Sequence, residues 1–233
     1  MASPGYTTAL IVGAGSGLSA SLTRLLASNG LKIALAARSP DDLAGLTAQT
    51  GAKAFRCDAS KEDEVARLFA EVESTVGAPD VVIYNASFRT RGAFIDLVPA
   101  DVEKAIAVSA FGAFLVAQQA ARRMLPKRHG AIFFTGASAG VKGYARSAPF
   151  AMAKFALRGL SQSLARELQP QGIHIAHFVI DGGIRSERRV VPADNPDSLL
   201  DPDAIAQTYL DVLRQPRNAW TAEVELRPWV ETF

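Results

Sequence analysis

Short apolar runs of strand length alternate along the chain with longer segments in which apolar residues recur at helical spacing. This alternation is typical of βαβ units and a parallel sheet. Several runs are apolar throughout, as expected of strands that helices cover on both faces. The predicted strands are Thr8–Val12, Lys32–Ala36, Ala52–Cys57, Val81–Tyr84, Ala131–Thr135, Ile173–Ile180 and Glu223–Leu226. The pattern therefore predicts an α/β fold with a doubly wound parallel sheet of about seven strands and helices on both faces.

Several helix starts carry capping signals. Ser-Pro-Asp-Asp at 39–42 places a capping serine, a first-turn proline and acids at the positive end of a helix. Ser-Lys-Glu-Asp at 60–63 is close to a capping box, and Asp-Pro-Asp at 201–203 opens a late helix. Two long helical segments, near Ala100–Met124 and Pro149–Leu168, are rich in alanine and other small apolar residues.

The chain shows no internal repeat, low-complexity tract or linker, so its 233 residues predict one domain over 1–233. The irregular stretch at 182–200 looks like a lid rather than part of the core. A hydrophobic content of 48% and a charged content of 21% are ordinary for a globular protein, and a net charge of +2 does not favour nucleic acid or an anionic membrane.

The cysteine content and the N-terminal stretch bear on the compartment. Cys57 is the one cysteine, so no internal disulfide is possible and a reducing compartment is favoured. The apolar stretch near the N-terminus is broken by Gly13, Gly15 and Gly17, so we expect neither a signal peptide nor a membrane span. The expectation is a cytoplasmic protein.

A glycine-rich turn follows the first predicted strand, and a helix follows the turn directly. A dinucleotide pyrophosphate needs close backbone approach and free amides at a helix N-terminus, which glycines at these spacings permit. Glycines also serve tight strand-to-helix turns, so the position after the first strand is what favours the binding interpretation. The turn reads Gly13, Ala14, Gly15, Ser16, Gly17, Leu18.

Three ordered motifs resemble those of the short-chain dehydrogenase/reductase family. The spacing from Gly13 through Gly17 to Ser19 resembles the family GxxxGxG signature, with serine replacing the last glycine. That position mainly governs how closely the helix packs on the strand. Asp58 resembles the family acid after strand three, which meets the adenine, and the segment at 84–87 (Tyr-Asn-Ala-Ser) resembles the NNAG element. The resemblance extends over nearly the whole chain and implies a Rossmann-type fold.

The residues after the second strand distinguish the two nicotinamide cofactors. An acidic residue there would bind the ribose hydroxyls of NAD(H) and repel a 2′-phosphate. This chain has Ala37, followed by Arg38 and Ser39. Arginine clamps a phosphate through paired donors, and a serine at a helix start adds another. We therefore favour NADP(H) over NAD(H); the alternative is that Arg38 is a solvated loop residue.

The family YxxxK motif corresponds to the segment from Phe150 to Lys154. In the family, the tyrosine transfers the substrate proton, and the lysine holds the nicotinamide ribose and lowers the tyrosine pKa. Lys154 is present, but Phe150 has no ionisable proton. The residues assigned to the cofactor are Gly13, Gly15, Ser16, Gly17, Leu18, Arg38, Ser39, Asp58, Ala59, Asn85, Ala86, Ser87 and Lys154.

Other positions of the family site depart as well. The family serine aligns with Ala137, which leaves Ser138 one place later, and the family asparagine aligns with Ser109. The PG element after strand six reads Asp181-Gly182. Positioned acid–base catalysis is worth roughly 10²–10⁴ in rate, so carbonyl reduction without its proton donor should be slow. The residues assigned to the cofactor largely remain, so the sequence supports cofactor binding more than turnover.

Three hydroxyls are candidates to replace the missing proton donor. Tyr144 lies in the loop before Phe150, where active-site residues of this fold gather; the alternative is an exposed loop tyrosine. Ser138 is either such a donor or a turn-forming hydroxyl, and we expect Ser109 to bond a helix carbonyl locally. Lys154 could lower the pKa of a neighbouring hydroxyl. The candidate catalytic residues are Lys154, Ser138, Tyr144 and Ser109.

The remaining reactive side chains carry weaker signals. Cys57 follows a buried strand and is interpreted as a core residue rather than a nucleophile. His129, His174 and His177 have no metal-like partners in the sequence, so we expect them to be structural or surface residues and predict no metal site.

The segment after strand six covers the substrate in the family. Arg185, Arg188 and Arg189 lie in it with few acids beside them. They either face a carboxylate or phosphate of a substrate or form a solvated charged surface.

Three function classes remain open at this point. The first is an NADP(H)-dependent oxidoreductase that acts on a small molecule. Reduction of an activated C=C bond would suit it because the proton can come from solvent, and carbonyl reduction through Tyr144 or a water held by Lys154 is also open. The second is a non-catalytic dinucleotide-binding pseudoenzyme or redox sensor, which the missing tyrosine favours. The third is a structural homo-oligomer without the ligand, which Lys154 and Arg38 do not favour.

The resemblance implies a homodimer or homotetramer that pairs through the two long helices. A second interface could involve the C-terminal segment at 226–230, which is apolar and contains a tryptophan. Small residues that would allow close helix approach are Ala110, Gly112, Ala113, Ala117, Ala153, Ala156 and Gly159.

Overall fold

The computed structural model describes residues 5–186 and 189–231. Its centre is a seven-stranded sheet in the order β3-β2-β1-β4-β5-β6-β9, and every neighbouring pair is parallel. The predicted doubly wound Rossmann-type fold is confirmed, with each strand boundary within about one residue of its prediction. The strands are β1 (Thr8–Val12), β2 (Lys32–Ala37), β3 (Lys53–Arg56), β4 (Val81–Tyr84), β5 (Gly130–Thr135), β6 (Ile173–Ile180) and β9 (Glu223–Leu226).

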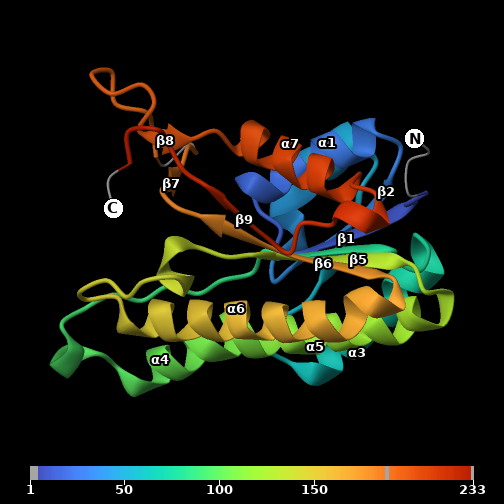
Figure 1. Cartoon of the computed structure of the whole chain (residues 1–233), viewed down its shortest axis with the longest axis horizontal. Helices are drawn as coiled ribbons and strands as arrows, with labels where there is room; N and C mark the ends of the chain where they lie inside the picture. Colours follow the sequence, from blue (N-terminus) through green and yellow to red (C-terminus); the bar gives the residue numbers. More distant parts are fainter. Residues whose placement is uncertain (1–4, 187–188, 232–233) are drawn as a thin grey trace.

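Helices cover both faces of the sheet (Figure 1). One face carries α1 (Leu18–Ser28), α2 (Ala44–Thr50) and α7 (Pro202–Leu213). The other carries α3 (Glu62–Thr75), α5 (Gly112–Met124) and α6 (Ala148–Leu168). Short 3₁₀ turns lie at Pro40–Leu43, Phe94–Asp96, Leu125–Lys127, Ser138–Gly140, Gln169–Gln171 and Arg217–Ala219.

The central strands bury both of their faces. In β1, Ala9 and Ile11 pack into the cluster beneath α1 and α7, whereas Leu10 and Val12 pack into the cluster beneath α3, α5 and α6. A strand that must fill two cores needs apolar residues at every position. This requirement is why β1, β4 and β5 read as unbroken apolar runs in the sequence.

The long helical segment predicted near Ala100–Met124 consists of α4 (Pro99–Ile106), a π-helical turn over Ala107–Phe111, and α5. The carbonyl of Val108, in this turn, accepts a hydrogen bond from the hydroxyl of buried Tyr84 at the end of β4. A Cβ at Gly112 would collide with that same hydroxyl and with the carbonyl of Ala59. Gly112 therefore lets the segment approach the carboxyl end of the sheet closely.

Of the three helix starts with predicted capping signals, only one has the side-chain hydrogen bond of an N-cap. The predicted capping box at 60–63 is wrong: Lys61 occupies the N-cap position of α3, and Ser60 instead donates to Asp58 Oδ1. Ser39 precedes the 3₁₀ turn at Pro40–Leu43 without a side-chain cap bond. At α7 the prediction is confirmed, because Asp201 Oδ1 accepts a hydrogen bond from the Asp203 amide at 2.9 Å.

The stretch after β6 contains two short paired strands, β7 (Gly183–Ile184) and β8 (Leu199–Leu200). Figure 1 shows them at the same end of the sheet as α4. An isolated antiparallel bridge joins Ser186 to Arg189 between them. The role of residues 182–200 as a substrate lid stays a prediction. Within residues 5–186 and 189–231, no helix combines the length and apolarity needed to cross a membrane.

Candidate functional site

The strand order reverses between β1 and β4, and a cleft of about 770 Å³ lies there, beyond the carboxyl ends of the strands. In doubly wound sheets, ligands bind at such a reversal point. The turn after β1, the ends of β2 and β3, and the loop after β4 line the cleft. The predicted cofactor residues among the lining are Gly13, Gly15, Ser16, Arg38, Ser39, Asp58, Ala59, Asn85, Ala86 and Ser87. The tertiary structure brings them together; their role toward a cofactor stays a prediction.

The other residues assigned to the cofactor lie outside this lining. Gly17 is the N-cap residue of α1 and lines an adjoining cavity of about 540 Å³, which shares Ser16 and Ser186 with the cleft. Leu18 points into the core and is 5% exposed. Lys154 is buried on α6. Leu18 can therefore contribute its backbone to a ligand, but its side chain is engaged in packing.

The glycines of the first turn have different physical roles. Gly13 has a φ of +85°, and a Cβ there would overlap the backbone of Ala86. At Gly15 and Gly17 an added Cβ would meet nothing within 4 Å. Gly13 is thus required by the packing of the turn against the segment after β4, whereas Gly15 and Gly17 leave room for close approach of a ligand.

Polar side chains tie the first turn to the end of β4. Ser19, at the family glycine position, donates from Oγ to the Gly13 carbonyl at 3.0 Å. Its Oγ also accepts a hydrogen bond from Asn85 Nδ2 at 2.8 Å. The serine therefore adds a bond between the turn and the neighbouring strand, where a glycine would add none.

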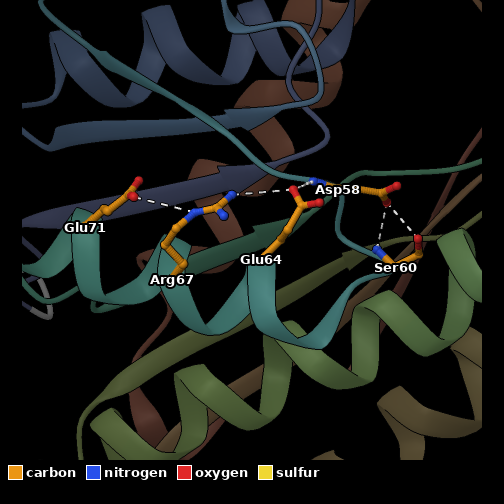
Figure 2. A network of polar contacts seen from close by, with 5 residues as sticks. All are labelled: Asp58, Ser60, Glu64, Arg67 and Glu71. Atoms are coloured by element: carbon orange, nitrogen blue, oxygen red, sulfur yellow. Dashed lines mark hydrogen bonds and ion pairs between the residues drawn. The ribbon is translucent and has the colours of Figure 1, made fainter.

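Asp58 belongs to a polar network at the end of β3 (Figure 2). Its Oδ1 accepts bonds from the amide of Ser60 at 3.0 Å and from the Ser60 hydroxyl at 2.7 Å. Its own amide donates to Glu64 Oε2 at 2.9 Å, and Glu64 in turn lies 3.6 Å from Arg67. Partial burial acts to raise the pKa of Asp58, but the bonds from Ser60 and the charges of Lys61 and Arg38 hold it below its ordinary value. The bonds from Ser60 therefore fix the orientation of the Asp58 carboxylate where the end of β3 lines the cleft.

Arg38 and Ser39 stand at the end of β2. Both side chains are exposed and line the cleft. Within the part of the chain that the structure describes, Arg38 forms no ion pair within 4 Å. The 2′-phosphate interpretation thus has an exposed cation at its predicted place, close enough to Asp58 to help lower the pKa of that carboxyl. Asp42 also lines the cleft. The sequence analysis did not place this acid there, although it lies only three residues after Ser39, in the Ser-Pro-Asp-Asp segment at 39–42.

Lys154 lies at the other end of the site. The side chain is 4% exposed, and Nζ donates to the Thr135 carbonyl at 2.8 Å. Burial lowers its pKa to about 8, because the charged ammonium loses most of its hydration. Nζ also lies 5.8 Å from the centroid of the Phe150 ring. The lysine is thus a buried cation held by one backbone carbonyl.

Comparison with known proteins identifies the family. The profile of the short chain dehydrogenase family matches residues 7–190. The chain belongs to the short-chain dehydrogenase family. It is 33% identical to a 3-oxoacyl-[acyl-carrier-protein] reductase, MabA, of Mycobacterium avium over 181 residues, which cover 76% of this chain and 67% of that protein.

Solved structures agree with this assignment. A short-chain dehydrogenase from Rhodopseudomonas palustris superposes with a TM-score of 0.83 and 32% identity, covering 96% of this chain and 99% of that one. A metagenomic short-chain oxidoreductase solved in complex with NADP superposes with a TM-score of 0.83 and 25% identity, covering 97% and 98% of the two chains. The chain is therefore a member of a family of oxidoreductases.

The candidate hydroxyls of this short-chain dehydrogenase lie in different settings. The expectation that Ser109 bonds a helix carbonyl is wrong: its Oγ lies 3.3 Å from Ser87 Oγ and accepts a bond from the Phe88 amide at 3.2 Å. Ser138 is half-buried at the start of a 3₁₀ turn. Tyr144 is 43% exposed. Among residues 5–186 and 189–231, no hydrogen bond links Ser138 or Tyr144 to Lys154, so their catalytic roles stay predictions.

Arg89 lies beside Phe150, and the sequence analysis did not identify it as a residue of the site. It lies in the loop after β4, and its Cζ lies 4.8 Å from the centroid of the Phe150 ring. Phe150 therefore faces two cations, Arg89 and Lys154. Arginines in a loop carry no periodic signal that identifies their partners, so only the fold could reveal this contact.

The interpretation of Cys57 and of the two histidines in β6 as structural agrees with their burial. Burial, with nearby Glu64, raises the pKa of the Cys57 thiol to about 12, so the thiolate is disfavoured. His174 stacks on Trp220, with ring centroids 4.6 Å apart, and burial lowers its pKa to about 4. His177 Nδ1 lies 2.9 Å from Glu223 Oε2.

The structure also shows where His129 and two of the three arginines of the predicted lid lie. His129 is half-buried and stacks on Tyr6. Arg185 pairs with Asp201, an acid from the start of α7, at 3.1 Å. Whether the lid arginines face a substrate or form a solvated surface stays a prediction. Arg188 lies outside the described residues. In the described part of the chain, no group of three or more His, Cys, Asp or Glu could hold a metal ion.

Proposed function

We propose that this short-chain dehydrogenase uses NADP(H) and transfers a hydride between it and a small molecule, at a carbonyl or an activated C=C bond. The observation that carries the proposal is the cleft at the β1–β4 reversal, lined by the glycine-rich turn at one point and by Arg38 at another. The open space at Gly15 and Gly17 fits a pyrophosphate, which a larger side chain would obstruct. The NADP complex of the metagenomic relative supports the same choice of cofactor.

The residues that would hold the cofactor divide by chemistry. Backbone amides of the first turn, at the N-terminus of α1, suit the negatively charged pyrophosphate. Asp58 would meet the adenine, and Arg38 with Ser39 would bind the 2′-phosphate through charge-assisted hydrogen bonds. Lys154 would hold the nicotinamide ribose, as the family resemblance implies. Once bound, NADP(H) supplies or accepts the hydride.

The proton must come from a group other than residue 150, because a phenylalanine ring has none to give. Reduction of an activated C=C bond needs only an electrostatic partner for the developing oxyanion, and solvent supplies the proton to carbon. Carbonyl reduction would need Tyr144, Ser138 or a water held by Lys154. With a pKa of about 8, Lys154 can exchange a proton near neutral pH more readily than an ordinary lysine.

A non-catalytic NADP(H)-binding protein, such as a redox sensor, is the second candidate. The end of the site around Phe150 and Lys154, called the reaction end below, favours it because two of its polar groups are already bonded to the protein itself. Ser109 is engaged by Ser87 and Phe88, and Lys154 by the Thr135 carbonyl. A site whose donors are satisfied internally has fewer bonds to offer a transition state.

The deciding experiment titrates the purified protein with NADPH and, separately, with NADH, following the fluorescence of the bound nicotinamide. We expect micromolar NADPH affinity and far weaker NADH binding. Arg38→Ala should weaken NADPH about 10- to 100-fold, the effect of losing a charge-assisted bond of roughly 1.5–3 kcal/mol. Arg166→Ala, an exposed arginine on α6, is the matched control and should change neither affinity.

The outcomes separate the candidates. Absence of binding of both cofactors would overturn the proposal. Equal affinity for NADPH and NADH, unmoved by Arg38→Ala, would remove the 2′-phosphate assignment. Tight NADPH binding without hydride transfer to any ketone or enone in single-turnover assays would favour the sensor.

We propose a homodimer or homotetramer that pairs through α5 and α6, with different contact residues from those first expected. Ala113, Ala117 and Ala153 are buried in the core of their own chain, as is Gly112, so they cannot form the interface. Exposed large apolar side chains on and beside these helices favour association: Phe111, Phe114, Met152 and Phe155. Sedimentation at micromolar concentration should show no monomer, whereas a clean monomer would reject this assembly.

A further inference from the structure

Arg89 lies directly beside the reaction end of the cleft. Its neighbours Ser87 and Phe88 both line the cleft, and its guanidinium lies over the Phe150 ring. An arginine stacked on an aromatic face is held in place while its N–H groups stay available in the plane of the guanidinium. The Phe150 ring therefore holds Arg89 beside residue 150, the position that the resemblance assigns to the family tyrosine.

Arg89 is surrounded by like charge. Burial, and then the charges of Arg91 and Arg189, lower its pKa from the ordinary value. Arg91 follows in the same loop, whereas Arg189 comes from the stretch after β6. The cluster of Arg89, Arg91 and Arg189 is thus assembled from two segments that meet only in the folded chain.

Among the residues that the structure describes, other arginines have carboxylate partners that these three do not have. Arg158 pairs with Glu223 at 2.6 Å, and Arg185 pairs with Asp201 at 3.1 Å. Of the carboxylates in the described part of the chain, none forms an ion pair with the three arginines of the cluster. Repulsion among unpaired like charges raises the energy of the protein, and a bound anion would remove that repulsion.

Arg189 connects the cluster to the cleft. It pairs through its backbone with Ser186, which lines both the cleft and the adjoining cavity. Arg89 follows the lining residues Ser87 and Phe88, and Arg189 pairs with the lining residue Ser186, so both arginines border the cleft. Arginine binds carboxylate and phosphate oxygens through two parallel N–H bonds, so the pair suits an anion at this border.

We propose that Arg89, together with Arg91 and Arg189, binds an oxyanion carried by the substrate, a carboxylate or a phosphate, beside Phe150. This inference rests on the proposed function, because it takes the Phe150 end of the cleft as the reaction end. It narrows the substrate to an anionic carbonyl compound or enone. The cluster acts by binding and orienting the substrate; Arg38, at the end of β2, serves the cofactor.

The test follows the arginine Nε–Hε signals of ¹⁵N-labelled protein by NMR, with and without NADPH, during titration with sodium acetate and with inorganic phosphate at constant ionic strength. Spectra of Arg89→Gln, Arg189→Gln and Arg166→Gln assign the signals. We expect a saturable shift of Arg89 and Arg189, with a midpoint at least about tenfold below any response of exposed Arg166. The anion with the lower midpoint identifies the group.

The variant Arg89→Gln should raise the anion midpoint of Arg189 about tenfold while NADPH affinity stays unchanged. A response of Arg89 no stronger than that of Arg166, for both anions, would overturn the inference. So would a lower NADPH affinity in Arg89→Gln with unaltered anion binding, since the cluster would then serve the cofactor. If NADPH itself fails to bind, the proposed function fails, but the titration of the free protein still reports on the anion site.

Discussion

The two ends of the cleft are built differently. At the cofactor end, recognition depends on open backbone and exposed groups: Gly15 and Gly17 meet nothing within 4 Å of an added Cβ, and Arg38 is exposed. At the reaction end, around Phe150, Ser109 and Lys154 are buried and already bonded to the Phe88 amide and the Thr135 carbonyl, whereas Tyr144 is exposed. The cofactor end offers backbone amides and Arg38, whereas the reaction end offers an aromatic ring beside two cations, Arg89 and Lys154.

Under the proposed function, this difference means that cofactor binding and turnover can vary separately in one fold. The cofactor end depends on backbone shape, which many side chains tolerate. Proton transfer depends on one side chain of the right acidity at one place, and a single replacement removes it. The following predictions test whether the two ends are as separate as their construction indicates.

The largest expected effect comes from Phe150→Tyr. If Phe150 occupies the proton-transfer position, the new phenol beside Lys154 should raise NADPH-dependent reduction of activated ketones by about 10²-fold or more. NADPH oxidation in the steady state measures the gain, and NADPH affinity should not change. Phe94→Tyr, which places the same phenol on the exposed 3₁₀ turn at Phe94–Asp96, is the control and should leave the rate unaltered. Equal rates in both variants would show that residue 150 is not the proton-transfer position.

Replacing Gly13 by alanine should mainly affect stability, whereas replacing Gly15 by alanine should mainly affect NADPH binding. Gly13→Ala should lower the free energy of unfolding by roughly 3 kcal/mol or more, because the methyl group overlaps the Ala86 backbone at a positive φ. Gly15→Ala should change it by less than about 1 kcal/mol but weaken NADPH binding, since its Cβ enters open space at the predicted pyrophosphate position. Urea unfolding and NADPH titration of both variants measure this. A destabilised Gly15→Ala variant with unaltered NADPH affinity would contradict the division of roles.

The smallest effect concerns the pH dependence of stability at Lys154. Its pKa is 10.5 in the unfolded chain and about 8 in the folded one, so the unfolded state binds more protons between these values. Stability is therefore reduced below pH 8 and recovers as pH rises toward 10.5. Relative to Lys154→Met, the wild type should gain about 2 kcal/mol from pH 8 to 9.5. Urea unfolding of both proteins, free of cofactor, measures the difference at each pH. A difference that stays constant with pH would show that Lys154 is not desolvated.

Much of this molecule could be predicted from local pattern. Unbroken apolar runs predicted the central strands β1, β4 and β5, because a strand covered on both faces needs apolar residues throughout. The strands at the two edges, β3 and β9, contain charged residues and were predicted from their length and place in the alternation. The turn after the first strand could be identified from its glycines and position. The capping box at 60–63 could not be judged in the same way, because Ser60 has a competing acceptor, Asp58, only two residues away.

The sequence pattern does not predict which small residues of the long helices are buried and which are exposed. Alanines and glycines in α5 and α6 looked alike in sequence, but Ala113, Ala117 and Ala153 face the core whereas Ala156 and Gly159 are exposed. A small side chain is compatible with either setting, so composition does not tell which neighbour it meets. The helix rotation set by packing on the sheet decides this.

The sequence by itself determined the fold class, the strands, the glycine-rich turn, the exposed arginine after the second strand, and the absence of an acidic proton at Phe150. Tertiary structure alone decided that Gly13 serves packing while Gly15 borders open space, and that Ser109 is bonded outside its helix. It also brought Arg89 over Phe150, although 61 positions separate them in the chain. The reason is that propensity, periodicity and turn chemistry act over a few residues, whereas contacts between loops depend on how the sheet and its two helical layers pack as a whole.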